Sequence, residues 1–107
     1  ITDVDEEGRS VKLADGVLGA KYRNGFEHPE YMEAGEIYPV RIRTTKISNT
    51  FREGHRIRLT LTSSGENFIF PNSNTKEGFD SSQVQKARIR IHWGGGTPSR
   101  VEFCREK

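Results

Sequence analysis

The sequence predicts an all-β fold: an antiparallel β-sandwich of the jelly-roll type, formed by a single domain that covers residues 1–107. Apolar and polar residues alternate with a period of two along several segments, whereas helical periodicity is hard to find. Turn dipeptides such as Asp15-Gly16 and Asn24-Gly25 separate those segments. With 107 residues, 32% of them hydrophobic, the chain has room for one domain with a thin core. Half-apolar strands of this kind are typical of antiparallel sheets with one buried face and one wet face.

The alternation is clearest in the segments 40–45, 56–62, 87–93 and 100–104, which we expect to be strands. In residues 56–62, apolar side chains take the odd positions, and arginine or threonine takes the even ones. In residues 87–93, Trp93 has the parity of Ile89 and Ile91, so we expect it in the core. Shorter strands are predicted at 1–5, 11–14 and 18–23. Long loops are predicted at 67–82 and at 28–35, the latter with a helical turn at 29–33.

Charge and cysteine content narrow the class of protein. Seventeen basic and fifteen acidic residues give a net charge of +2, with both signs interspersed along the chain. A single cysteine, Cys104, excludes an internal disulfide framework and a thiolate-rich metal site. No run approaches the roughly 18 apolar residues of a membrane helix, so we expect no membrane partner. The chain opens with Ile1 and no signal-peptide pattern, so we expect a piece of a longer protein.

Metal and cofactor motifs are incomplete. The run Asp3-x-Asp5-x-Glu7 resembles the start of an EF-hand loop, but the twelfth position is Ala14, so a hairpin turn is favoured over a loose calcium site. The glycines that begin at Gly94 lack the Gly-Lys-Ser/Thr ending and the following helix of a phosphate-binding loop. We therefore predict neither a bound metal nor a cofactor.

Catalytic patterns are equally incomplete. There is no Gly-x-Ser-x-Gly elbow, which would expose a nucleophile above a sheet. His28, His55 and His92 lack the helical spacing of a zinc peptidase motif. Cys104 lies on a predicted alternating strand, as an ordinary side chain would. We predict no catalytic residue in this chain.

Surface features leave alternatives open. Arginines project in pairs from the polar faces of predicted strands, and we expect a solvated face with cross-strand pairs to Glu36, Glu53 or Glu102. Docking on another domain of the same polypeptide is the main alternative, and no aromatic-interleaved motif indicates nucleic acid. Carbohydrate binding by exposed aromatic rings is a further alternative. The residues concerned are Arg41, Arg43, Arg56, Arg58, Arg88 and Arg90, and for carbohydrate Tyr22, Tyr31, Tyr38 and Trp93.

Motifs in a fixed order carry a resemblance over nearly the whole chain. The most specific is FREGHRIRL at residues 51–59; the others are TDVDEEGRS (2–10), ADGVLGAKYR (14–23), AGEIYPV (34–40), FPNSNT (70–75) and PSRV (98–101). Together they resemble the C-terminal domain of the Xaa-Pro dipeptidyl-peptidase family, which includes cocaine esterases and α-amino acid ester hydrolases. Gly19 stands where that family usually has arginine.

The resemblance implies a non-catalytic, galactose-binding-domain-like jelly-roll that is incomplete at its N-terminus. It implies a parent serine hydrolase that cleaves X-Pro peptide or ester bonds, with its triad in an upstream α/β-hydrolase domain that this domain supports. An uncovered sheet edge in such a piece predicts homo-oligomers formed by strand pairing. The family occurs in the cytoplasm and as exported proteins. A free carbohydrate-binding or adhesion module is the rival interpretation.

The motifs also imply structural roles for particular residues. Gly54 allows a turn, and His55 has ring nitrogens that can hydrogen-bond across a strand end. Arg56 is expected to clamp a loop carboxylate or backbone carbonyls. Pro98 and Ser99 open the closing strand of the motif set.

Overall fold

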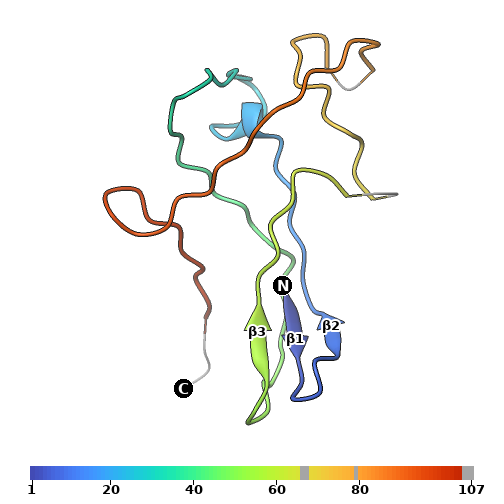
Figure 1. Ribbon diagram of the computed structural model, residues 1–107, viewed down its shortest axis with the longest axis vertical. Coiled ribbons are helices and arrows are strands. Elements are labelled where there is room, and N and C mark those ends of the chain that lie inside the picture. The colour runs from blue at the N-terminus through green and yellow to red at the C-terminus, as the bar shows by residue number, and fades with distance from the viewer. Residues whose placement is uncertain (66–67, 79, 105–107) are drawn as a thin grey trace. The chain divides into compact units, whose positions relative to one another are not determined.

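A computed structural model describes residues 1–65, 68–78 and 80–104, and the chain divides into two compact units. The first unit is Ile1–Thr62 and the second is Ser63–Lys107. The elements are β1 (Thr2–Val4), β2 (Ser10–Lys12), the short 3-10 helix η1 (Ala20–Tyr22) and β3 (Arg56–Arg58), all in the first unit (Figure 1). The expected all-β class is confirmed. The second sheet of a sandwich and the jelly-roll strand order stay predictions.

The three strands form one antiparallel sheet in the order β2-β1-β3. On one side of β1, Thr2 lies opposite Lys12 and Val4 opposite Ser10. On the other side, Thr2 lies opposite Arg58 and Val4 opposite Arg56. The central strand therefore joins a local hairpin to a segment about fifty residues further along the chain.

A tight turn connects β1 to β2, as the sequence predicts. The backbone N–H of Gly8 donates to the carbonyl of Asp5 (3.1 Å), and Gly8 has φ +87°, a conformation that glycine adopts without strain. The Asp5 carboxylate accepts hydrogen bonds from the backbone N–H (2.7 Å) and from Nε (2.8 Å) of Arg9. The acidic run that resembles a calcium loop therefore closes a hairpin.

The buried apolar side chains among the described residues are Val4, 1% exposed, and Ala14, 2% exposed. The N-terminal amine of Ile1 donates to the carbonyl of Ala14 (2.7 Å), which fixes the start of β1. A Cβ at Gly16 would overlap the carbonyl oxygen of Arg43, so the chain after Ala14 passes directly against the 42–45 segment. The core is as thin as the composition predicts.

The predicted strand at 18–23 is wrong. The backbone N–H of Tyr22 donates to the Gly19 carbonyl (2.8 Å), and that of Arg23 donates to the Ala20 carbonyl (3.3 Å). These local bonds turn the backbone into η1 and remove it from pairing with another strand. The helical turn predicted at 29–33 is also wrong, because those residues have no helical hydrogen bonds among the described contacts.

The predicted strands at 40–45, 87–93 and 100–104 carry no strand assignment in the structure. Their apolar side chains are correspondingly exposed: Val40 and Ile42 are each 45% exposed, and Trp93 is 76% exposed. The expected core position of Trp93 is therefore wrong. Alternation gives a segment one apolar face, but burial needs a second layer, which the described residues of each unit do not supply.

The second unit is organised around Ser73, which is 4% exposed. Its hydroxyl donates to the Gly78 carbonyl (2.5 Å), and its own carbonyl accepts from the N–H of Gln85 (2.8 Å). Asn74, at φ +57°, donates from Nδ2 to the Gln85 carbonyl (2.7 Å). These bonds hold the described part of the predicted 67–82 loop; residues 67 and 79 of that loop lie outside the described residues.

Candidate functional site: the β3 turn and its basic groove

The most specific motif of the sequence, residues 51–59, forms the turn before β3 and β3 itself. The backbone N–H of His55 donates to the Arg52 carbonyl (3.1 Å) and closes the turn. Gly54 sits at φ +80°, and a Cβ there would overlap the carboxylate of Glu6 on the β1–β2 connection. Glycine is needed at this position for its conformation, whereas the nearby Glu6 side chain is flexible and can move aside.

His55 links this turn to the central strand. Its Nδ1 lies 2.8 Å from Oδ1 of Asp3, and both side chains are largely buried, at 22% and 15% exposure. Because an ionised carboxylate only accepts hydrogen bonds, Nδ1 carries the proton and donates it. The pair lies next to the position where Asp3 faces Ile57 in the β1–β3 ladder. It therefore ties the start of β3 to β1 at a fixed register.

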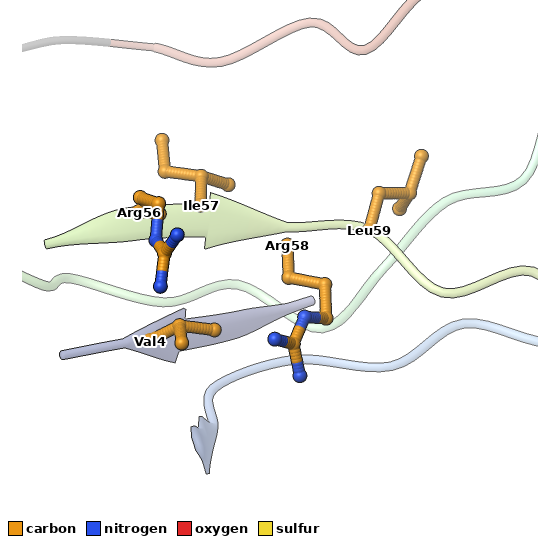
Figure 2. Close-up of a pocket in the computed structure, with 5 residues that line it drawn as sticks. All are labelled: Val4, Arg56, Ile57, Arg58 and Leu59. Carbon is orange, nitrogen blue, oxygen red and sulfur yellow. The ribbon is translucent and has the colours of Figure 1, made fainter. Parts of the chain in front are cut away.

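Beyond His55, β3 borders an open groove of about 330 Å³. In Figure 2 the guanidinium groups of Arg56 and Arg58 extend to one side of β3, and Ile57 and Leu59 extend to the other. Val4 of β1 lies opposite Arg56 and forms part of the lining. The groove thus combines an apolar strand surface with two cationic groups two residues apart.

The charges of this groove are not neutralised within the described residues. Neither Arg56 nor Arg58 makes an ion pair or side-chain hydrogen bond there, and the same holds for Arg41, Arg43, Arg88 and Arg90. The predicted cross-strand pairs with Glu36, Glu53 or Glu102 are not found in this part of the chain. Glu102 instead pairs with its near neighbour Arg100 (2.8 Å). Among the described residues, Arg56 makes neither of the expected clamps, to a loop carboxylate or to backbone carbonyls.

The other motif residues lie in the second unit. The backbone N–H of Ser99, which follows Pro98, donates to the carbonyl of His92 (3.1 Å). This bond brings the two ends of the 92–99 segment together around Gly94 and Gly95, which have φ values of +65° and +63°. Gly94 and its neighbours therefore form a chain reversal.

Arg23 is an organising residue that is missing from the predicted site residues. Its side chain is 7% exposed, and its Nη1 donates to the carbonyls of Ala20 (3.2 Å) and Glu30 (2.7 Å). Its Nη2 bonds the Glu30 carboxylate (3.0 Å), and its guanidinium lies 4.5 Å from the ring centre of Tyr38. Its position just before the Asn24-Gly25 turn is the signal that marks it in the sequence.

The aromatic candidates for sugar binding have different surroundings. The ring of Tyr22 lies 5.1 Å from that of Phe26, and Lys21 Nζ lies 5.0 Å from the centre of the Tyr22 ring. Tyr38 is covered by the Arg23 guanidinium and accepts a hydrogen bond at its hydroxyl from the backbone of Glu33 (3.1 Å). Tyr22 and Tyr38 therefore have structural contacts. Tyr31 is 49% exposed and Trp93 is 76% exposed.

Local hydrogen bonds also set the ionisation of three carboxylates. For Asp5, partial desolvation raises the pKa, but hydrogen bonds from Arg9 outweigh it and hold the pKa below its usual value. The hydrogen bond from Lys12 lowers the pKa of Asp15, and that from Thr75 lowers the pKa of Glu77. Among the described residues, no three His, Cys, Asp or Glu side chains gather as metal ligands would. Nor does this part of the chain contain a helix with the length and apolarity needed to cross a bilayer.

The three-stranded antiparallel sheet and the groove beside β3 define a small all-β domain with exposed arginine and apolar side chains. The sequence profile of the X-Pro dipeptidyl-peptidase C-terminal non-catalytic domain matches residues 1–102. The chain is also 38% identical over 104 residues to a cocaine esterase from Rhodococcus sp. (strain MB1 Bresler). It therefore belongs to the family of X-Pro dipeptidyl-peptidase C-terminal non-catalytic domains. No solved structure matches the chain significantly.

The extent of these matches bears on the whole protein. The alignment with the esterase covers 94% of this chain but 18% of the esterase. The 51–59 motif and the Pro98-Ser99 pair both lie inside the region matched by the family profile. The resemblance inferred from the ordered motifs is thereby confirmed for the domain.

Proposed function

We propose that this chain is the C-terminal supporting domain of a serine hydrolase that cleaves X-Pro peptide or ester bonds. The observation that carries the proposal is the family match over residues 1–102, together with the similarity to a cocaine esterase. In this proposal the catalytic triad belongs to an upstream α/β-hydrolase domain. Residues 1–107 act as one jelly-roll domain that holds the hydrolase domain and its substrate pocket in place.

The exposed apolar faces of the first unit support a docking role. Val40, Ile42, Ile57 and Leu59 are each between 41% and 49% exposed. Because these side chains are already about half buried, covering the rest of each gains about half of the 1.5–3 kcal/mol of a full burial, so a cover over these faces has a driving force. The remainder of a longer polypeptide would supply that cover and, with it, the second layer of the predicted sandwich.

The test is truncation of the longer polypeptide. Removing residues 1–107 from it should lower its melting temperature and raise KM for a chromogenic ester, with a smaller effect on kcat. A matched control is the intact polypeptide with Arg100→Gln, since Arg100 and its partner Glu102 are both more than 70% exposed. An unchanged melting temperature and unchanged kinetics after truncation would refute the supporting role.

Homo-oligomers formed by strand pairing are part of the same proposal. The outer strands β2 and β3 have one side each that is not paired within the described sheet. Light scattering across a hundredfold range of concentration should show a mass that rises toward a dimer. A constant monomer mass over that range would contradict strand pairing between copies.

A carbohydrate-binding module is the second candidate function, and the exposure of Trp93 favours it. A flat exposed indole on a glycine-rich reversal is suited to stacking on a sugar ring. Titration with oligosaccharides should quench the fluorescence of Trp93, the single tryptophan of the chain, if this function is correct. Unchanged fluorescence would remove the candidate.

A further inference from the structure

The strand β3 is an edge strand of the described sheet. Within the residues described for the first unit, β3 pairs with β1 on one side and with no strand on the other. The unpaired side presents backbone N–H and C=O groups that can accept a further strand. A strand from a partner can therefore pair with this edge of β3, and the side chains of β3 determine which strand binds.

The side chains of β3 and of Leu59, which directly follows it, alternate in chemistry. Arg56 and Arg58 project to one face, whereas Ile57 and Leu59 project to the other (Figure 2). Ile57 is 49% exposed and Leu59 is 41% exposed, so the apolar face is accessible. Because directly opposed residues of an antiparallel pair share a face, an added strand meets cations at every second position and apolar side chains at the positions between.

The cationic side of this pattern is unsatisfied. Arg56 and Arg58 border the open groove of about 330 Å³ and have no carboxylate partner among the described residues. Opposite charges that face each other across a strand pair are stabilising, and like charges are destabilising. A strand with carboxylates at alternate positions is thus the complement of β3.

We propose that the free edge of β3 binds a protein strand in which acidic and apolar residues alternate. The carboxylates face Arg56 and Arg58, and the apolar side chains lie beside Ile57 and Leu59. The inference needs only the sheet and its side chains, so it stands whether or not the parent protein is a hydrolase.

The same pattern disfavours one mode of self-association. Two copies that pair antiparallel over the whole of β3, centred on Ile57, place Arg56 of each copy opposite Arg58 of the other. Pairing over the full strand therefore sets arginine against arginine. Pairing between copies is left to β2, and β3 is kept for an acidic partner.

The test is fluorescence anisotropy with the whole 107-residue chain and labelled peptides of about ten residues, a typical strand length. The main probe alternates glutamate with valine. A second peptide has the same composition with the glutamates in one block, a third alternates lysine with valine, and a fourth probe is single-stranded DNA. The alternating acidic peptide should bind the most tightly.

Two double variants distinguish binding at β3 from non-specific attraction by the positive charge of the chain. Arg56→Gln with Arg58→Gln should weaken binding of the alternating acidic peptide by at least about tenfold. Arg88→Gln with Arg90→Gln removes the same charge at the same spacing, outside any assigned strand, and should change binding by less than about twofold. A gain of function guards against misfolding: Arg56→Glu with Arg58→Glu should switch the preference to the lysine–valine peptide.

Several results would overturn the inference. Equal losses in the two glutamine variants would show that net charge alone drives binding. Equal binding of the block peptide would exclude recognition of alternation. Tighter binding of the DNA than of any peptide would assign the groove to nucleic acid, and a failure of the glutamate variant to switch preference would exclude strand pairing at β3.

Discussion

Replacing Arg23 with alanine should release the 23–38 segment from η1. The Arg23 guanidinium donates to two backbone carbonyls, bonds the Glu30 carboxylate and stacks on Tyr38. Hydrogen bonds to a charged group contribute about 1.5–3 kcal/mol each when buried, whereas the Glu30 carboxylate is half exposed and adds at most about 1 kcal/mol. Because the bond to the Glu30 carbonyl is solvent-exposed and the Ala20 carbonyl keeps its bond from the Arg23 backbone, we expect a net loss of about 2 kcal/mol.

Amide hydrogen exchange at Glu30 measures this loss directly. The Glu30 N–H donates to the Lys21 carbonyl (2.7 Å), and this bond holds the segment against η1. A loss of about 2 kcal/mol corresponds to roughly thirtyfold faster exchange. Arg100→Ala is the control, because its pair with Glu102 is exposed and should leave exchange at Glu30 unchanged. Equal exchange in wild type and Arg23→Ala would refute the role assigned to Arg23.

Three further outcomes follow from the β1–β3 region. Gly54→Ala should lower the free energy of unfolding, measured in urea melts, by about 1–2 kcal/mol, because alanine is strained at φ +80° and its Cβ meets Glu6. The control is Gly96→Ala, which should lower it far less because a Cβ at Gly96 meets open space and its φ is ordinary. His55→Ala should cost about 1 kcal/mol by loss of the Asp3 bond, and a melt no lower than that of wild type would contradict it. Because the pKa of Asp5 is lowered in the folded chain, its contribution to the free energy of unfolding is present above about pH 4 and is lost as the pH falls through the folded pKa. Asp5→Asn should reduce this loss of stability at acid pH when the free energy of unfolding is measured against pH. An unchanged loss would contradict the role of Asp5.

Local features of the fold are predictable from the sequence. The β1–β2 turn is specified by Asp5 and Gly8, which bond within a few residues of one another. The turn before β3 is likewise specified by Gly54. At both turns the backbone has a positive φ, and the sequence has glycine, the residue type that adopts this conformation without strain.

Features that depend on distant partners are not predictable in the same way. The contact between His55 and Asp3 joins residues 52 positions apart, and their pairing follows from the β1–β3 register rather than from either segment. Tyr22 alternates as a strand residue would, but the bonds of Arg23 to Ala20 and Glu30 favour a helical turn there. Trp93 lies at the alternate position that a core residue would take, but alternation shows only which side chains share a face of the strand. It does not show whether another layer covers that face.

The proposed function places this chain in a longer polypeptide, and its most direct test is a titration of the separately produced remainder of that proposed polypeptide with the 107-residue chain. The rate of chromogenic ester hydrolysis is measured at each addition, and the chain alone is measured in parallel. A supporting, non-catalytic domain predicts a rate that rises to saturation with added chain, and no turnover by the chain alone. A flat titration, or turnover by the chain alone, would contradict the account.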